Sequence, residues 1–437
     1  MKHIKLISLI LAVVLCLFLT GCDTVGSGVD KLIVPPKLEG DLYPVQQALE
    51  DSAGDNLILK YPLSGQYRSA FILKDLDGDG RDEAVALYAV AGETSLSIHI
   101  NVISSNGDEW KSRGDLSLIG SDVESVTFAD LDKDGTLEII VGWMVYGTVD
   151  KKVGVYTFDG TALIQRALEP YTNFLCAELT GSGGDDLVVL HLNATEKTAG
   201  AKVFSLATEG ISELGSVALD GGVSSYLSPV VSTLTDGTPA IYVDALKGNG
   251  ILTEIVWFKD GVLNSVFDPA APEAQPTYRT GTASSRDFDG DGIIDIPLLE
   301  LLESTADLSE TDKVYYTNWC SFSGSNFRIN QSMFMNYTDG YSVTVPKELK
   351  KKIFLLRNTE TRMRTLFSYD PETKMSGEEL LRILAVNPAD YESGQYEVGG
   401  FTLLEKTETI AYLAAVNPEN TFGITLEKVT EMFNTIK

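Results

Sequence analysis

Three short loops of the chain carry carboxylates at a regular spacing. In each loop, acidic residues stand at positions one, three, five and nine, and a glycine stands at position six. Alternate side chains of a tight loop point the same way, so the carboxylates should converge, while the glycine permits a turn that directs the next carbonyl inward, at position seven. The predicted ligands are Asp75, Asp77, Asp79, Arg81 and Glu83 in loop one, Asp130, Asp132, Asp134, Thr136 and Glu138 in loop two, and Asp287, Asp289, Asp291, Ile293 and Asp295 in loop five.

The chemistry of these ligands favours Ca²⁺. Hard oxygen ligands without His or Cys argue against zinc and copper, and Mg²⁺ prefers a strict octahedron that retains waters. An EF-hand has the same initial spacing but needs a bidentate Glu at position twelve, where this chain has Ala86, Val141 and Leu298. The remaining alternative is a solvated acidic turn, but three carboxylates in one loop repel one another without a cation. We therefore predict one structural calcium ion in each of the three loops.

These loops belong to a sequence repeat of about fifty residues. Five loops begin at residues 75, 130, 178, 233 and 287, so successive starts are 55, 48, 55 and 54 residues apart. Loop three has only Glu178 and Asp186 as carboxylates, and loop four, 233–237, is shortened, so we expect neither to hold a cation. A second sequence signal recurs with the same period: a residue pair typical of β-hairpin turns follows each loop. These pairs are Asn106-Gly107, Asp159-Gly160, Glu209-Gly210, Asp260-Gly261 and Ser323-Gly324.

The elements between these signals predict a mostly β fold. Continuous apolar runs such as 84–90 and 139–145 suit strands buried on both faces, and alternating runs such as 98–102 and 153–158 suit strands with one wet face. Each repeat then forms a four-stranded unit, the size of a β-propeller blade. Five repeats predict a propeller of about five blades over residues 42–338, with 57–63 pairing with the last blade. A β-solenoid or a row of separate sandwiches is the alternative.

The repeats resemble the FG-GAP/VCBS class of calcium-binding propeller repeats, which also occurs in integrin α-chain heads. The resemblance covers roughly residues 63–337 and rests on the acidic loops with their flanking strands, because the literal Phe-Gly and Gly-Ala-Pro pieces are absent. It implies a β-propeller whose acidic loops bind calcium. Nothing about integrin partners follows from it.

The first residues have the pattern of a bacterial lipoprotein signal. Lys2 and Lys5 precede an apolar run over 6–19, which is shorter than the roughly 20 residues that a membrane-spanning helix needs. The tail Leu19-Thr20-Gly21-Cys22 resembles a lipobox, which implies a signal peptide at 1–21 and lipidation of Cys22; ordinary secretory cleavage near Gly21 is the alternative. Residues 22–41 are predicted to be a flexible tether. We expect a lipid-anchored protein on the extracytoplasmic face of a bacterial cell membrane.

The last hundred residues differ from the repeats. Residues 340–437 have 12 basic and 14 acidic side chains, whereas the preceding part has 22 against 48. We predict a small α+β domain over 339–437, with a short helix at 346–356 and strands at 362–369, 380–386 and 407–416. A final helix is predicted from one apolar stripe, formed by Leu426, Val429, Met432, Phe433 and Ile436. Its basic cluster could contact anionic lipid or cell-wall polymer, although such a run is more often a solvated face. The cluster comprises Lys350, Lys351, Lys352, Arg357, Arg362 and Arg364.

The net charge and the motifs of the sequence exclude several classes of function. A formal net charge of −28 argues against nucleic acid as a partner, because phosphate binding relies on Lys and Arg. The sequence has no Gly-x-Ser-x-Gly elbow, His-Glu-x-x-His pair or phosphate-cradling glycine loop, so we predict no catalytic residue. We expect a binding or scaffold module for a cell-envelope glycan or protein. The alternative is a propeller-based polysaccharide hydrolase or lyase, since a carboxylate-pair glycosidase needs no His and exposed tryptophans can stack on sugars.

Overall fold

The computed structural model describes residues 42–92, 97–107, 109–145 and 151–436. Two compact units make up this part of the chain. The first ends at Tyr171 and includes Ser205–Ser212, and the second contains Thr172–Phe204 and everything from Glu213 onward. The predicted signal peptide, Cys22 and the tether lie outside the described residues. Among the described residues, no helix combines the length and the apolar character needed to cross a bilayer.

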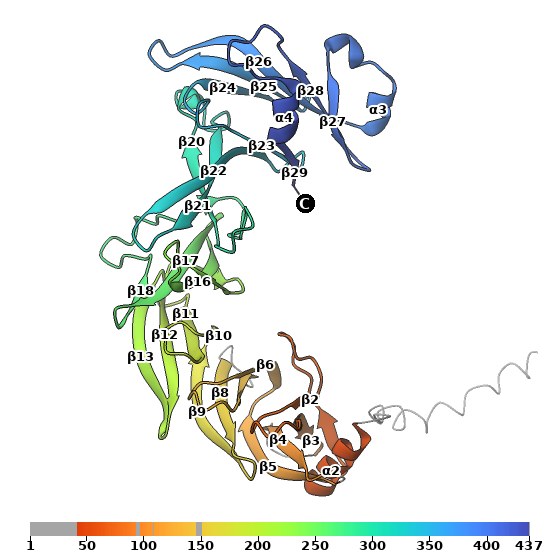
Figure 1. Ribbon diagram of the computed structural model, residues 1–437, viewed down its shortest axis with the longest axis vertical. Coiled ribbons are helices and arrows are strands. Elements are labelled where there is room, and N and C mark those ends of the chain that lie inside the picture. Colours follow the sequence, from red (N-terminus) through yellow and green to blue (C-terminus); the bar gives the residue numbers. More distant parts are fainter. Residues whose placement is uncertain (1–41, 93–96, 108, 146–150, 437) are drawn as a thin grey trace, which may run out of the picture. The chain divides into compact units, whose positions relative to one another are not determined.

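The first unit contains a helix and two antiparallel sheets (Figure 1). Helix α2 (Tyr43–Ala53) has a proline in its first turn and buries Val45, Ala48 and Leu49 against the first sheet. The first sheet has the order β1-β3-β4-β5, with β2 also paired to β3, and the second has the order β6-β7-β8-β9. Their strands are β1 (Leu57–Leu59), β2 (Phe71–Lys74), β3 (Glu83–Val90), β4 (Ser97–Ser105), β5 (Trp110–Ile119), β6 (Asp122–Ala129), β7 (Glu138–Met144), β8 (Lys151–Phe158) and β9 (Leu163–Tyr171).

Three further sheets of the repeat region follow. The third has the order β10-β11-β12-β13, the fourth is built on β14-β16-β17-β18 with β15 and β19 added, and the fifth has the order β20-β21-β22-β23-β29. Their strands are β10 (Asn173–Ala177), β11 (Asp186–Asn193), β12 (Thr198–Ala207), β13 (Gly210–Leu219), β14 (Ser225–Tyr226), β15 (Val230–Thr233), β16 (Pro239–Lys247), β17 (Gly250–Lys259), β18 (Val262–Ser265), β19 (Arg279–Thr280), β20 (Ile296–Leu301), β21 (Tyr315–Phe322), β22 (Phe327–Asn336), β23 (Tyr341–Thr344) and β29 (Phe433–Thr435).

A last antiparallel sheet in the second unit has the order β24-β25-β26-β28-β27. Helix α4 (Leu426–Met432) lies beside it in Figure 1, and its Val429 joins the apolar core that this sheet shares with the fifth sheet. The remaining elements are β24 (Ile353–Asn358), β25 (Met363–Asp370), β26 (Met375–Val386), α3 (Pro388–Glu392), β27 (Thr402–Lys406) and β28 (Ala411–Val416).

The predicted fold class, mostly β with successive four-stranded antiparallel units, is confirmed. Each predicted hairpin pair joins the strands expected of it, at β4–β5, β8–β9, β12–β13, β17–β18 and β21–β22. The glycine of every pair has a positive φ, from 78° at Gly261 to 124° at Gly210, a conformation that glycine adopts without strain. The inner strands β3 and β7 are almost wholly buried, as their continuous apolar runs predict.

Apolar cores join neighbouring sheets. Residues of the first and second sheets share one core, which includes Val85, Val141 and Trp143. The third and fourth sheets share another, and the fourth and fifth a third. A sheet of this kind has two apolar faces that it cannot bury alone, so burial by its neighbours stabilises each repeat.

Four local predictions were wrong. Residues 346–356 form turns and then strand β24, because Lys351 has a φ of 69° that interrupts a helix and the apolar residues after it pair with β25. Of the predicted 407–416 strand, only Ala411–Val416 form a strand, β28, and residues 407–410 form the loop that follows β27. The final helix ends at Met432, and the next residues form β29, which pairs with β23 of the fifth sheet. Of residues 57–63, Leu57–Leu59 form β1 and pair with Tyr88–Val90 of the first sheet.

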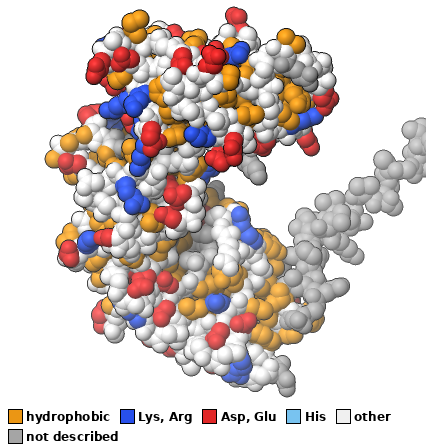
Figure 2. Space-filling model, turned by 45° about the horizontal axis from the view of Figure 1, so that its top comes forward, with side chains coloured by type: hydrophobic (Ala, Val, Ile, Leu, Met, Phe, Trp, Pro, Cys, Tyr) orange, Lys and Arg blue, Asp and Glu red, His pale blue; other side chains and the backbone are white. Residues whose placement is uncertain are grey.

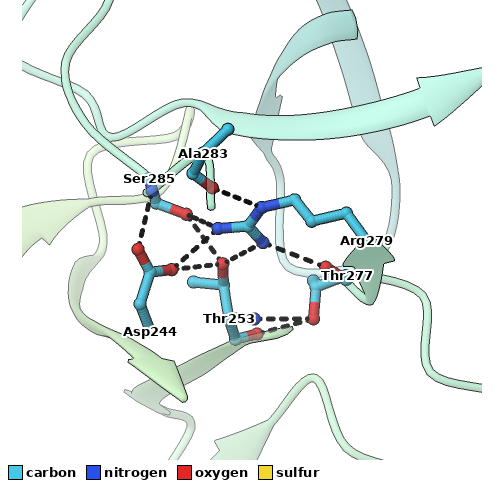
Figure 3. A network of polar contacts seen from close by, with 6 residues as sticks. All are labelled: Asp244, Thr253, Thr277, Arg279, Ala283 and Ser285. Carbon is cyan, nitrogen blue, oxygen red and sulfur yellow. Dashed lines mark hydrogen bonds and ion pairs between the residues drawn. The ribbon is translucent and has the colours of Figure 1, made fainter. Parts of the chain in front are cut away.

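A buried guanidinium secures the fourth sheet. Arg279 is 2% exposed, and its Nη2 lies 3.0 Å from Asp244 Oδ1 (Figure 3). The same guanidinium donates hydrogen bonds to the Thr253 hydroxyl and to the carbonyls of Thr277 and Ala283. Asp244 also accepts a hydrogen bond from the main-chain nitrogen of Ser285. This network fixes the segment around β19 to strands β16 and β17.

Candidate metal centres

The acidic loops all lie at one kind of position, between the first and second strands of a repeat. Loop one joins β2 to β3, and loop two joins β6 to β7. Position nine is the first residue of the second strand, Glu83 in β3 and Glu138 in β7, so its side chain is buried beneath the loop. In the fifth repeat, Asp295 pairs with Arg286 just before β20.

Loops one, two and five share one set of main-chain hydrogen bonds. The carboxylate at position one accepts from the main-chain nitrogens of positions four and six, as Asp75 does from Gly78 at 2.8 Å and Gly80 at 3.0 Å. The corresponding distances are 2.7 and 3.1 Å to Asp130, and 2.7 and 3.0 Å to Asp287. The carboxylate at position nine accepts from position two, at 3.0 Å in loop one, 2.7 Å in loop two and 3.3 Å in loop five.

This shared geometry needs left-handed backbone at positions four and six. Gly80, Gly135 and Gly292 stand at position six, with φ between 85° and 88°. Position four is glycine in loops one and five, but it is Lys133 in loop two, with a φ of 67°. The positive φ at position six agrees with the prediction that this glycine permits a turn. The sequence did not predict that position four also needs left-handed backbone.

Each loop brings three carboxylates together. One oxygen from each member of a group lies within 4.8 Å of the others, in the range that one cation can bridge. The groups are Asp75, Asp77 and Glu83 in loop one, Asp130, Asp132 and Glu138 in loop two, and Asp287, Asp289 and Asp291 in loop five.

The other predicted carboxylates have protein partners instead. Asp79 accepts hydrogen bonds from the main chain and the guanidinium of Arg81, and Asp134 accepts from the nitrogen and hydroxyl of Thr136. Asp295 accepts a 2.8 Å hydrogen bond from the Asn330 amide. Sequence analysis missed the side-chain contacts of Arg81 and Asn330, and Asn330 gives no local signal because it lies 35 residues away on β22. Ile293 donates its main-chain N–H to Asp291.

The electrostatics of the loops disfavour full ionisation without a cation. The pKa of Glu138 is raised to about 7, mainly by burial and also by the neighbouring carboxylates of Asp132, Asp134 and Asp130, against the hydrogen bond from Leu131 that lowers it. Burial likewise raises the pKa of Asp295 to about 6 and that of Glu83 above its ordinary value. Asp132 also has a raised pKa, from burial and from Asp134. A divalent cation would offset this repulsion.

Loop three has the same backbone without the carboxylate group. Gly181 and Gly183 have φ of 72° and 87°, and Gly183 N donates to Glu178 at 2.8 Å, as at positions four, six and one of the acidic loops. However, the Thr180 and Ser182 hydroxyls at positions three and five hydrogen bond to each other at 2.9 Å, and Thr180 also donates to Asp186. In loop four, Asp236 forms a 2.8 Å ion pair with Lys259. Both loops therefore satisfy their polar groups internally.

The basic cluster of the last hundred residues is divided among several partners. Lys350 pairs with Glu300 at 2.8 Å, and Arg362 pairs with Asp339 at 2.6 Å. Figure 2 shows basic and acidic side chains interspersed over the visible face. Three of the four tryptophans, Trp143, Trp257 and Trp319, are buried in cores.

Comparison with known families supports the repeat assignment in part. An FG-GAP-like repeat family model matches residues 75–141, which contain loops one and two. That match covers one section of the chain and identifies a repeat of this type there. A search of curated proteins found no match.

Solved structures with similar folds are distant. A rhamnogalacturonan lyase of Bacillus licheniformis is 13% identical, with a TM-score of 0.32, over 74% of this chain and 77% of that one. The periplasmic gluconolactonase PpgL of Pseudomonas aeruginosa is 12% identical, with a TM-score of 0.30, over 74% and 87%. Sqt1 of Saccharomyces cerevisiae is 11% identical, with a TM-score of 0.30, over 82% and 86%. With TM-scores this low, none of them indicates an activity for this chain.

Proposed function

We propose that this protein is a membrane-anchored, extracytoplasmic lipoprotein whose β-propeller repeats are stabilised by calcium and act as a binding or scaffold module. The proposal that calcium binds is supported by the geometry that loops one, two and five share. In each loop, three carboxylates converge on a backbone that is held by the same hydrogen bonds.

The donor set suits a hard cation. Loop one supplies oxygens from Asp75, Asp77 and Glu83, and no His or Cys stands in any of the three carboxylate groups. Main-chain carbonyls at position seven would complete the coordination, as predicted for Arg81, Thr136 and Ile293. A bound ion would hold the junction between the first two strands of its repeat. Extracellular calcium modules have dissociation constants of roughly 10⁻⁴ to 10⁻³ M. Such sites would be occupied outside a cell, so the bound ions would have a structural role.

The anchoring part rests on residues 1–22, with Cys22 as the lipidated residue. Two or three acyl chains hold a protein on a bilayer firmly, whereas one chain gives only marginal binding. This position would expose the repeats to cell-envelope glycans or proteins. The alternative of a polysaccharide hydrolase or lyase needs a pair of carboxylates beside a substrate cleft. A cavity of about 380 Å³ between the fifth and the last sheet has no carboxylate in its lining, so it does not offer such a pair.

Thermal melting tests the calcium part. The protein is treated with a chelator, and its melting temperature is then measured as calcium is added to about 10 mM, above the range of such modules. We expect the temperature to rise by several degrees, since a ligand that binds only the folded state stabilises it. Magnesium at the same concentration is the matched control and should have a smaller effect. No shift with calcium would refute the proposal.

Cell fractionation tests the anchor separately. Cells that express the chain in a bacterial host are labelled with radioactive palmitate and separated into membrane and soluble fractions. The wild-type chain should be labelled and sediment with membranes, whereas Cys22→Ser should lose the label. An unlipidated chain that keeps its apolar 6–19 segment can still sediment with membranes, so the label decides the test. An unlabelled wild-type chain, or a Cys22→Ser chain that is still labelled, would contradict lipid anchoring.

A further inference from the structure

A cavity of about 380 Å³ lies within the second unit, between the fifth sheet and the last sheet. That volume falls within the roughly 300–1,000 Å³ range of small-molecule sites. Its apolar wall comes from both sheets. Phe334 and Val343 belong to the fifth sheet, and Leu355, Leu366 and Leu381 belong to the last.

The charged residues of this cavity are all basic. Lys313, Arg357 and Arg364 line it, and none of its lining residues is Asp or Glu. This is the reverse of the chain as a whole, whose formal net charge is −28. Acidic side chains outnumber basic ones by 62 to 34 over the sequence, so a lining with three cations and no carboxylate is a marked local exception.

Two of these cations face each other across a strand pair. Arg357 on β24 and Arg364 on β25 are direct partners in the antiparallel register, and the next pair on the same face is Leu355 with Leu366. Like charges directly opposite each other destabilise a sheet. Among the described residues, no carboxylate forms an ion pair with either arginine, whereas Lys313 pairs with Glu310 at 2.5 Å. Arg357 donates instead to the carbonyl of Lys313 at 3.0 Å.

A buried hydroxyl lies near one of the two arginines, Arg364. Tyr341 is 2% exposed and lines the cavity, and its hydroxyl has no hydrogen bond of normal geometry within the described part of the chain, although Asn336 and Arg364 lie near it. A buried hydroxyl without a partner costs free energy that a ligand oxygen could restore.

We propose that this cavity binds a small amphipathic organic anion. The apolar body would lie against the row of leucines, and the carboxylate or phosphate head would lie between Arg357 and Arg364. A guanidinium pair suits such a head because planar N–H groups bind carboxylate and phosphate oxygens at two points. The anion would also remove the repulsion between the two arginines. This site is separate from the calcium loops and does not depend on them.

Calorimetric titration with ten-carbon ligands tests the proposal. The purified protein is titrated with decanoate, decyl phosphate, decanol and decyltrimethylammonium, each below the concentration at which it forms micelles. We expect at least one of the two anions to bind at least tenfold more tightly than the alcohol and the cation, which is about the contribution of one charge-assisted hydrogen bond. The tighter anion identifies the head group. Equal binding of decanol, or no binding of either anion, would overturn the proposal.

Substitutions then locate the bound ligand. Arg364→Gln should lower the affinity for the anion about tenfold, without lowering the melting temperature of the ligand-free protein, because it removes a like-charge contact. Arg357→Gln should weaken binding similarly, and Leu355→Trp should abolish it by filling the cavity. Arg328→Gln on β22 is the matched control, since Arg328 is exposed and does not line the cavity, and it should bind as wild type. Unchanged binding by the Arg364→Gln and Arg357→Gln proteins would overturn the assignment.

Discussion

Loops two and three share one backbone and differ in how their charges are balanced. Both have left-handed residues at positions four and six, and both use the position-one carboxylate to accept the nitrogen of position six. In loop two, Asp130, Asp132 and Glu138 converge, and burial with mutual repulsion raises the pKa of Glu138 to about 7. In loop three, hydroxyls replace the carboxylates of positions three and five and hydrogen bond to each other.

The comparison distinguishes the residues that form the turn from the residues that would bind a cation. The turn forms in both loops, which share left-handed residues at positions four and six and carboxylate acceptors at positions one and nine. The carboxylates at positions three and five add repulsion to the metal-free fold, and in loop two the hydrogen bonds from Thr136 to Asp134 offset only part of it. The fourth sheet shows a further solution, in which the buried Asp244 has the cation Arg279 supplied by the chain itself.

The largest effect should follow from removing that internal cation. Arg279→Met leaves Asp244 buried without its partner, so we expect a loss of about 3–5 kcal/mol in the free energy of unfolding, equal with and without calcium. Lys259→Met is the control, because it breaks an exposed pair with Asp236 and should change the free energy of unfolding little. Chemical denaturation measures both. A calcium-dependent loss in the Arg279→Met protein would contradict the distinction between internal and external cations.

The next effect tests the carboxylates of loop two. The double substitution Asp130→Asn and Asp132→Asn should remove one site, and with it about 1.4–2.7 kcal/mol of stabilisation at roughly 10 mM calcium. Unfolding curves in calcium and in chelator measure the difference. Glu178→Gln, at position one of loop three, is the matched control and should leave the calcium-dependent stabilisation unchanged. If both proteins lose the same calcium response, loops two and three do not differ as we infer.

A smaller effect should appear in the dependence of stability on pH. Burial raises the pKa of both Glu138 and Glu254 to about 7, and an unfolded glutamate has its pKa near 4.5. Each side chain is neutral in both states at low pH, and from pH 4.5 to 7 the unfolded state loses its proton first, so each group destabilises the fold as the pH rises. Without calcium, Glu138→Gln and Glu254→Gln should each flatten this decline in melting temperature.

Calcium should change the contribution of Glu138 to the pH dependence of stability, but not that of Glu254. A cation at loop two would favour the ionised form of Glu138, so in calcium only Glu254→Gln should still flatten the pH profile. An undiminished effect of Glu138→Gln in saturating calcium would show that no cation reaches that carboxylate.

The smallest effect concerns the shared turn. Gly181→Ala in loop three should cost about 1 kcal/mol, because an L-residue at a φ of 72° is strained although the added methyl meets no atom within 4 Å. Lys133→Ala at the same position of loop two should change stability little, since that site already holds an L-residue at 67°. Denaturation in chelator measures both. Equal losses would mean that the turns are not equivalent.

The sequence predicted local features of this molecule well. The spacing of acidic loops and Gly-containing pairs placed the strands of each repeat, because turns depend on a few adjacent residues. The lack of carboxylates at positions three and five also distinguishes loop three from loops one, two and five in the sequence itself.

Features that depend on distant contacts were missed. Strand β29 joins the fifth sheet from about ninety residues beyond β23, and Asn330 reaches Asp295 from another strand. The Arg279 network and the Arg357–Arg364 pair likewise depend on strand register, which composition does not specify. Ring closure by five repeats, the calcium ions and the lipid at Cys22 remain predictions.

Counting bound calcium tests the central claim most directly. Equilibrium dialysis with radioactive calcium, at protein concentrations near the expected dissociation constants, gives the number of ions per chain. We predict three for the wild type, two for the Asp130→Asn and Asp132→Asn protein, and three for Glu178→Gln. Either no bound calcium, or an unchanged count after the loop-two substitutions, would contradict the account.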